Sequence, residues 1–322
     1  MNRPPLDHAK ASRLLRYLAI PAGAGALALT LTAAAPATQP DVGALTSVAT
    51  IPVGQNPTAM ASDSATGIVY VACTGPSPDV YAIDAATNTV VATIPVGADP
   101  RAITVNQITD TIYVASETAG AVSVIDGATN TVTATVAVPD VSLVAADQSD
   151  NKIFAVGKGV LSAIAGATNV VAGTIDLPST IIGGLAVNPV TKKLYYGYNQ
   201  NVVTLSAKTG KQLATVKARF VVQNIAVDAS NNMVYVMTGY YRPELLLGLN
   251  GATGAFEPHG TKVPDSRGEN GPVGLTVDQD RLRGPVRFAE RLRLPQHPRR
   301  RPRRGLGGHL ERHLDRQSRR RL

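Results

Sequence analysis

The stretch "ATGIVYVACTGPSPDVYAIDAATNTVVATIPVGADP", residues 65–100, decides the fold, because it returns further along the chain as "ITDTIYVASETAGAVSVIDGATNTVTATVAVPD", residues 108–140. Both stretches hold a strand around a tyrosine, a turn, a strand ending in Ile-Asp, an Ala-Thr-Asn turn and a strand of Val and Thr. Apolar and polar residues alternate and β-branched residues are frequent, which favours strands over helices. Self-similarity at a fixed period indicates a repeat architecture.

Three weaker copies of this unit follow, beginning at Asn151, Lys192 and Asn232. Each copy also opens with a short strand that ends near an Asp or Asn, so each unit contains four strands. The aromatic residue of the second strand recurs at intervals of 43, 41, 41 and 40 residues. These anchors are Tyr70, Tyr113, Phe154, Tyr195 and Tyr235.

Four short strands in about 40 residues are typical of a β-propeller blade of the WD40-like or NHL-like kind. A single blade cannot bury both its faces, so several must pack face to face. The alternative, a β-solenoid, has rungs that repeat at shorter periods. We therefore predict an all-β protein, a β-propeller of four-stranded blades with about five complete repeats plus partial blades.

The two ends of the repeat region predict an incomplete ring. Residues 45–54 match the fourth strand of a repeat, but no first three strands of that pattern precede them. Residues 271–280 match a first strand, and the pattern stops after Asp280. We therefore assign residues 45–280 to the propeller and 281–322 to a separate Arg- and Pro-rich tail that we expect to be disordered.

The tail has two possible explanations. It contains 15 Arg, no Lys, no Tyr and no Ile, whereas residues 38–280 hold 4 Arg and 8 Lys. The first is a shifted reading frame or a truncated gene, because out-of-frame translation of GC-rich DNA gives such a composition. The alternative is a genuine basic tail that binds nucleic acid or an anionic surface.

The N-terminal segment predicts export. Basic residues precede the apolar run 17–37, which ends in the small-residue pattern Ala35-Pro36-Ala37. We interpret 1–37 as a helical signal peptide and 38–44 as a linker, with secretion, the periplasm or the cell surface as the destination. An uncleaved membrane anchor is the alternative.

Charge and cysteine content narrow the classes of function. Residues 38–280 carry 12 basic and 19 acidic side chains, a net charge of −7, so the total of +8 comes from the two ends. Such a body does not attract nucleic acid in general. Cys73 is the one cysteine, so no intramolecular disulfide can form, and its apolar strand predicts a buried, inert thiol.

The chain resembles the YVTN family of β-propeller repeat proteins. The resemblance is carried by "IVYVACT" (68–74), "TIYVASE" (111–117), "MVYVMTG" (233–239), "SVIDGATNTV" (123–132) and the link "IPVGADPRAITV" (94–105). It implies a seven-bladed ring, of which this chain would be an incomplete version, and a secreted or cell-surface protein of bacteria or archaea. It does not imply one activity, because propellers host many functions.

The residues with catalytic potential are few. His259 is the only histidine between residues 38 and 280, and His309 and His313 lie in the tail. Asp84 and Asp126 recur at the same place in successive repeats, which favours a role in capping turns. No phosphate-binding loop or calcium loop is present in the sequence. We therefore expect no enzyme activity, cofactor or bound metal.

Two main classes of function remain, with a weaker third. The first is a non-catalytic scaffold that binds a protein, glycan or small ligand on one propeller face, where the links between blades place Gln55, Asn56, Asp99 and Arg101. The second is a hydrolase or lactonase-like propeller enzyme, which needs convergent acidic or His residues and a metal. The third is an exported DNA-binding propeller, which would depend on a genuine basic tail.

The frame hypothesis makes a direct prediction. Sequencing the 3′ end of the gene and translating all three frames after the Asp280 codon should restore a Tyr-Val strand, an Ile-Asp strand and a Thr-Gly or Thr-Asn turn in another frame. If no frame restores them, the Arg-rich tail is genuine.

Overall fold

A computed structural model describes residues 15–17, 26–31, 49–239, 245–257 and 261–262. All of them belong to one compact unit, Met1–Arg291. The predicted first strand at 271–280, His259 and the whole of 281–322 lie outside the described residues.

The described chain consists of antiparallel β-sheets, which confirms the all-β prediction. Five sheets have four strands each, and within a sheet each strand pairs with the next in sequence. These strands are β4 (Pro57–Asp63), β5 (Ile68–Cys73), β6 (Asp79–Asp84) and β7 (Thr89–Pro95); β8 (Pro100–Asn106), β9 (Thr111–Ser116), β10 (Ala121–Asp126) and β11 (Thr131–Ala137); β12 (Val141–Asp147), β13 (Lys152–Gly157), β14 (Val160–Ala165) and β15 (Val170–Asp176); β16 (Gly184–Asn188), β17 (Lys193–Tyr198), β18 (Asn201–Ser206) and β19 (Gln212–Lys217); β20 (Val222–Asp228), β21 (Met233–Thr238), β22 (Leu245–Asn250) and β23 (Thr261–Lys262).

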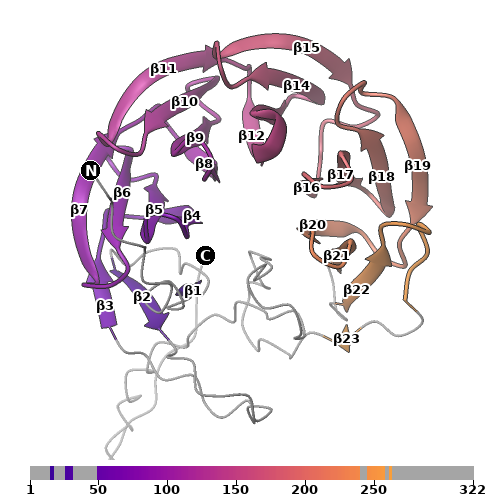
Figure 1. The fold of residues 1–322 in the computed structure, drawn as a ribbon, viewed down its shortest axis with the longest axis horizontal. Coiled ribbons are helices and arrows are strands. Elements are labelled where there is room, and N and C mark those ends of the chain that lie inside the picture. Colours follow the sequence, from indigo (N-terminus) through magenta and orange to yellow (C-terminus); the bar gives the residue numbers. More distant parts are fainter. Residues whose placement is uncertain (1–14, 18–25, 32–48, 240–244, 258–260, 263–322) are drawn as a thin grey trace, which may run out of the picture. The chain divides into compact units, whose positions relative to one another are not determined.

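The five sheets are the blades of a propeller. Figure 1 shows them following one another along an arc, with the first strand of each sheet innermost and the fourth outermost. The inner strands β4, β8, β12, β16 and β20 contact one another in that order. The prediction of five complete repeats is therefore confirmed, and we number the blades 1 to 5 from β4 onward.

A sixth, three-stranded sheet precedes blade 1. It contains β1 (Leu15–Tyr17), β2 (Ala26–Leu31) and β3 (Ala49–Pro52), in that order. The position of β3 at the edge of the sheet fits its prediction as an outer strand. The sequence predicted a helix over 1–37, which is wrong for β1 and β2. The alternating "ALALTL" of β2 is a strand that pairs with β3, from Ala26 opposite Pro52 to Leu29 opposite Ala49.

The apolar core lies between neighbouring blades. The second strands of blades 2, 3 and 4 are buried on both sides, because one face meets the blade before and the other meets the blade after. Tyr70, Tyr113 and Tyr195 are the largest fully buried side chains, each in the second strand of its blade. Blade 1 packs on Ile51 of β3, which is 2% exposed.

The outer strands carry β-bulges that keep their free edges irregular. A register shift falls at the same point of the β6–β7, β10–β11, β14–β15 and β18–β19 pairs. The extra residues are Val91, Thr133, Ala172 and Leu213. A bulge twists the edge of a sheet and makes it a poor template for pairing with another chain.

The tight turns use residues that tolerate a left-handed backbone, as the Thr-Asn and Thr-Gly pairs predicted. Asn88, Asn130 and Asn169 have φ between 54° and 57°, and Gly210 and Gly254 have φ of 72° and 71° in the same turn of blades 4 and 5. Asp84 Oδ1 accepts hydrogen bonds from the amides of Ala86 and Thr87, and Asp126 caps the next blade's turn in the same way. The capping role predicted for both Asp residues is confirmed.

The buried tyrosines give a first stability prediction. The Tyr113 hydroxyl is buried and has no hydrogen-bond partner among the described residues, and Phe154 stands at the equivalent place of blade 3. Removing a hydroxyl that is buried without a partner costs nothing in hydrogen bonding. Tyr113→Phe should therefore leave the free energy of unfolding within about 0.5 kcal/mol of the wild type, or raise it.

The control is Tyr113→Ala, which removes the ring and should cost about 3–5 kcal/mol. Both variants can be measured by urea unfolding followed by circular dichroism. A loss of more than about 1 kcal/mol in the Phe variant would show that the hydroxyl has a partner.

Candidate functional site

Each blade ends in two sets of loops, one on each side of the ring. On the first side, the link that enters a blade is hydrogen-bonded to the turn between its second and third strands. Thr74 N donates to Asn56 O at 3.0 Å, Glu117 N to Asp99 O at 3.0 Å, and Gly239 N to Val221 O at 2.9 Å. We call this side the link face.

The link face carries all four predicted contact residues. Asn56 and Asp99 both have a left-handed backbone, with φ of 49° and 60°, and occupy the same position in the links that enter blades 1 and 2. Gln55, Asn56 and Arg101 are exposed, and Asp99 is half-buried. The structure brings Asp99 and Arg101 together, whereas Gln55 and Asn56 belong to the preceding link.

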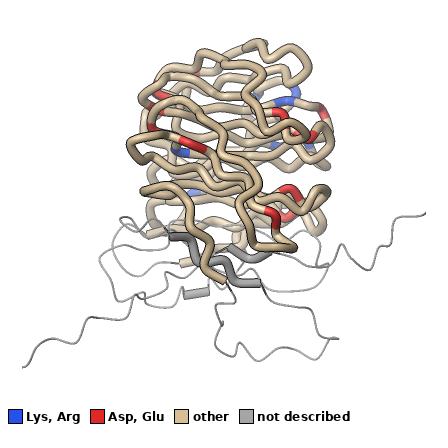
Figure 2. Tube along the Cα trace, turned by 90° about the vertical axis from the view of Figure 1, so that its left-hand side faces the viewer, with Lys and Arg blue, Asp and Glu red and all other residues tan. Residues whose placement is uncertain are grey.

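Arg101 is held between two acids. Its guanidinium lies 2.9 Å from Asp99 Oδ2 and 2.8 Å from Glu117 Oε2, and Thr118 Oγ1 also donates to Asp99. Figure 2 shows charged positions scattered along the described chain rather than gathered in one patch. The Arg101 cluster is thus a local polar feature of the blade 2 loops, paired and oriented before any partner arrives.

A bulge at the start of the inner strand fixes this position in four blades. The register shifts by one residue at the start of β4, β8, β12 and β20. The extra residue is Thr58, Arg101, Ser142 and Gln223 in turn. One backbone device therefore places four different polar residues at this position. Thr58 and Arg101 are exposed, Ser142 and Gln223 are half-buried, and the Thr58 hydroxyl donates to Pro100 O of the next link at 2.6 Å.

The opposite side of the ring, which we call the turn face, is built from a repeated set of contacts. In every blade the residue with a left-handed backbone at the end of the first turn accepts a hydrogen bond, through its carbonyl, from the start of the last turn. These residues are Gly67, Asp110, Asn151, Lys192 and Asn232, with φ between 45° and 77°.

The turn face also joins neighbouring blades. The last residue of each inner strand is a buried Asp or Asn, and in blades 2, 3 and 4 its side chain reaches the left-handed residue of the next blade. Asn106 Nδ2 donates to Asn151 Oδ1 at 2.9 Å, and Asn188 Nδ2 donates to Asn232 Oδ1 at 3.0 Å. Asp147 accepts from Lys192 Nζ at 3.3 Å. We call these contacts the blade joints.

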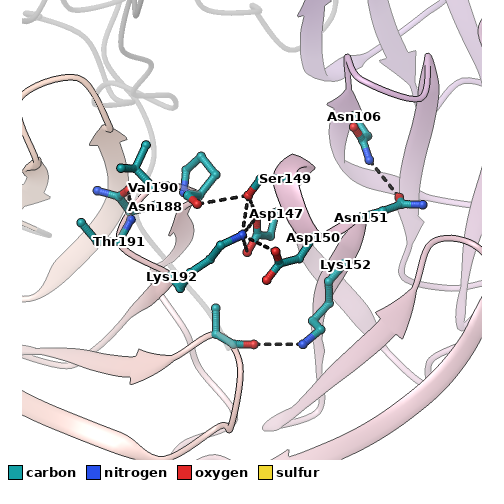
Figure 3. A network of polar contacts seen from close by, with 12 residues as sticks. Asn106, Asp147, Ser149, Asp150, Asn151, Lys152, Asn188, Val190, Thr191 and Lys192 are labelled. Carbon is teal, nitrogen blue, oxygen red and sulfur yellow. Dashed lines mark hydrogen bonds and ion pairs between the residues drawn. The ribbon is translucent and has the colours of Figure 1, made fainter.

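The joint between blades 3 and 4 is an ion cluster (Figure 3). Lys192 Nζ contacts Asp147, Asp150 and the Ser149 hydroxyl, and Ser149 donates to Pro189 O at 3.1 Å. Burial by itself would lower the pKa of Lys192, but the hydrogen bonds to Asp150 and Asp147 outweigh it and hold that pKa above its usual value. The hydrogen bond from Lys192 lowers the pKa of Asp150.

The joints were missed in the sequence, although a signal is present. The last turn begins with Gly127, Gly166 and Gly251 where the left-handed residue is Asp or Asn, and with Ala85 and Ala207 where it is Gly or Lys. A Cβ at these three glycines would overlap the Oδ1 atom of Asp110, Asn151 or Asn232. Whether the last turn begins with Gly or with Ala therefore indicates which side chain the left-handed residue of the same blade carries.

Of the remaining candidates, Cys73 lies within the described residues and His259 does not. Cys73 is fully buried, and burial raises the pKa of its thiol to about 11, so it is a thiol rather than a thiolate, as predicted. Within the described ranges, no three His, Cys, Asp or Glu side chains come together as a metal site. No helix in the same ranges is long and apolar enough to cross a membrane.

Comparison with known proteins shows the fold class. No family model matches the sequence, and no curated protein does. Among solved structures, the Kuenenia stuttgartiensis hydrazine synthase matches with a TM-score of 0.56 at 17% identity, over 63% of this chain and 67% of that chain. A chain of the mitotic checkpoint complex matches with a TM-score of 0.53 at 18% identity, over 62% and 63%. The chain thus spans about two thirds of each, and at these identities the likeness shows a β-propeller and nothing finer.

The two charged clusters should differ in their effect on stability. Lys192→Met leaves Asp147, whose side chain is 1% exposed, without its cation, and should lower the free energy of unfolding by about 3 kcal/mol. Arg101→Ala removes only solvent-screened ion pairs and should cost no more than about 0.5 kcal/mol.

The triple variant Asp147→Asn/Lys192→Asn/Ala207→Gly is the matched control. It rebuilds the Asn–Asn joint found on either side, together with the glycine that makes room for the Asn side chain there. It should recover most of the loss in urea unfolding. A triple variant as unstable as Lys192→Met would show that the cation is needed for more than pairing with Asp147.

Proposed function

We propose that this protein is a binding scaffold that recognises another protein through the link face. The observation that carries the proposal is the bulge at the start of the inner strands, which keeps its geometry in four blades while its residue changes from Thr58 to Arg101, Ser142 and Gln223. A constant frame with variable polar side chains is what specific recognition uses, because orientation is set by the scaffold and chemistry by the side chains.

The turn face supports this proposal by contrast. In blades 2, 3 and 4 its buried Asp or Asn side chain bonds to the left-handed residue of the next blade, so these polar groups are used inside the protein. On the link face, Arg101 is 49% exposed and Glu117 is 41% exposed, although they are paired. Exposed, pre-oriented charges on a rigid sheet end are suited to contact a partner with little loss of side-chain entropy.

The place of action in this proposal is outside the cytoplasm. It rests on the basic, apolar and small-residue pattern of residues 1–37 and on the resemblance to YVTN repeats. Processing after Ala37 would remove β2, the strand that pairs with β3. A mature exported form would then have β3 free to take a different neighbouring strand.

Site-specific photo-crosslinking in the producing cells tests the proposal. Thr118 and Thr129 are both exposed threonines of blade 2, the first on the link face and the second on the turn face. A photoreactive residue at position 118 should give a discrete crosslinked protein in the extracytoplasmic fraction, and one at position 129 should not. Arg101→Ala should weaken the crosslink from position 118 several-fold.

Crosslinking that is equal from the two positions, or present only at position 129, would contradict recognition through the link face. N-terminal sequencing of the fractionated protein tests export separately. A chain that starts at Thr38 supports it, and a chain retained in the cytoplasm with Met1 intact contradicts it.

A further inference from the structure

The joint between blades 1 and 2 differs from the others in its chemistry. Its two residues are Asp63, at the end of β4, and Asp110, the left-handed residue of blade 2. At the Asn–Asn joints an amide N–H of one side chain meets a carbonyl oxygen of the other. Figure 3 shows the joint of Asn106 and Asn151. At the joint of blades 3 and 4 a lysine supplies the protons. At the joint of blades 1 and 2 the equivalent groups are two carboxyls, and ionised carboxylates only accept hydrogen bonds.

The donor is missing on both sides of this joint. Asp63 is 1% exposed, and its Oδ1 accepts hydrogen bonds from the amides of Ala65 and Thr66. Its Oδ2 and the Oδ1 of Asp110 are both buried and find no donor among the described residues. The equivalent side chains are hydrogen-bonded to each other at the joints of blades 2 and 3, 3 and 4, and 4 and 5, so the repeat places the carboxyls of Asp63 and Asp110 opposite each other.

The surroundings do not neutralise this pair. The ion pairs formed by the described residues include neither carboxyl. The titratable groups that act on it are Asp126, a third acid at the end of β10, and Tyr70, whose buried hydroxyl also has no partner in the described part. Burial first, then the charge of Asp63 and a hydrogen bond with it, and then the charge of Asp126 raise the pKa of Asp110.

Two charged carboxylates at such a place would repel each other and lose their hydration. One proton removes both costs, since it makes one carboxyl a donor and the other its acceptor. It also reproduces the donor and acceptor pattern of the two Asn–Asn joints. A calcium ion between the oxygens would instead need several further oxygen ligands at about 2.3–2.6 Å.

We propose that Asp63 and Asp110 share one proton in the folded protein, so that the joint of blades 1 and 2 is a proton-binding site that strengthens in acid. The proton lies between Asp63 Oδ2 and Asp110 Oδ1, and the pair carries one negative charge instead of two. This property is independent of the proposed function, because it concerns the turn face.

The effect on stability has a defined sign. A carboxyl whose pKa is raised by folding binds more protons in the folded than in the unfolded state. The stabilisation is therefore complete below the ordinary carboxyl pKa of 3.8 and is lost as pH rises through the raised pKa of Asp110. The joint of blades 3 and 4 has the opposite pH dependence. Because the pKa of Asp150 is lowered in the folded protein, the stabilisation from this carboxylate is lost as pH falls through that pKa.

Thermal unfolding of the full chain between pH 5 and pH 8, followed by circular dichroism, tests the proposal with Asp63→Asn. The amide of this variant can donate to Asp110 Oδ1 without a shared proton, as Asn106 donates to Asn151. We expect its Tm at pH 8 to exceed that of the wild type by about 2–4 °C, and the gap to shrink or reverse at pH 5.

Asp147→Asn is the matched control. It removes the equivalent buried carboxylate of blade 3, where the neighbour is Lys192, and should lower Tm at pH 8. The proposal is overturned if Asp63→Asn lowers Tm at pH 8, or if its gap to the wild type is the same at both pH values. It is also overturned if calcium raises the Tm of the wild type at pH 8 but not that of Asp63→Asn, because the joint would then hold a cation.

Discussion

A four-stranded blade has two apolar faces, and each neighbouring blade can cover only one of them. The second strands show what this constraint demands, since Tyr70, Tyr113 and Tyr195 are buried where two blades meet. Burial of apolar area is not directional, so it brings blades together without fixing their register. The polar blade joints add the direction, because a buried Asp or Asn must meet a partner at one place on the next blade. Core and joints together therefore set how each blade sits on the next.

The sequence predicted the repeated parts of the fold and missed the contacts between repeats. The four strands, the aromatic anchors and the turn caps at Asp84 and Asp126 follow from local patterns, because alternation, β-branching and turn chemistry act within a few residues. The joint of Asp147 and Lys192 spans 45 residues, and only the alignment of one blade with the next brings the two together. The expected helix over 1–37 failed at β2, where alternating Ala and Leu residues can form either a helix or a strand and the exposed edge of β3 decides.

The sequence placed Asp99 and Arg101 in the link that enters blade 2, but it did not indicate their contacts. In the structure Asp99 lies in that link, and Arg101 is the second residue of β8. Their mutual ion pair, and the contact of Arg101 with Glu117 from the turn between the second and third strands of the same blade, depend on the bulge that directs the Arg101 side chain. A bulge leaves little trace in one repeat. It becomes visible only when several repeats show a shift at the same place, as in β4, β8, β12 and β20.

In the proposed function the two faces of the ring divide the work between recognition and cohesion, and their residues explain why. On the link face a change of side chain at the bulge leaves the backbone contacts intact, so Thr58 can become Arg101 or Gln223 from blade to blade. On the turn face a change at a joint must be matched across the blade boundary: Asn meets Asn, Asp meets Lys, and the Gly or Ala of the last turn changes with them. Asp63 and Asp110 are the joint at which neither partner supplies a donor, and a proton from solvent is the smallest group that completes it. The repeat thus ties one blade boundary to pH, whereas its amide-paired joints hold blades together at any pH in the neutral range.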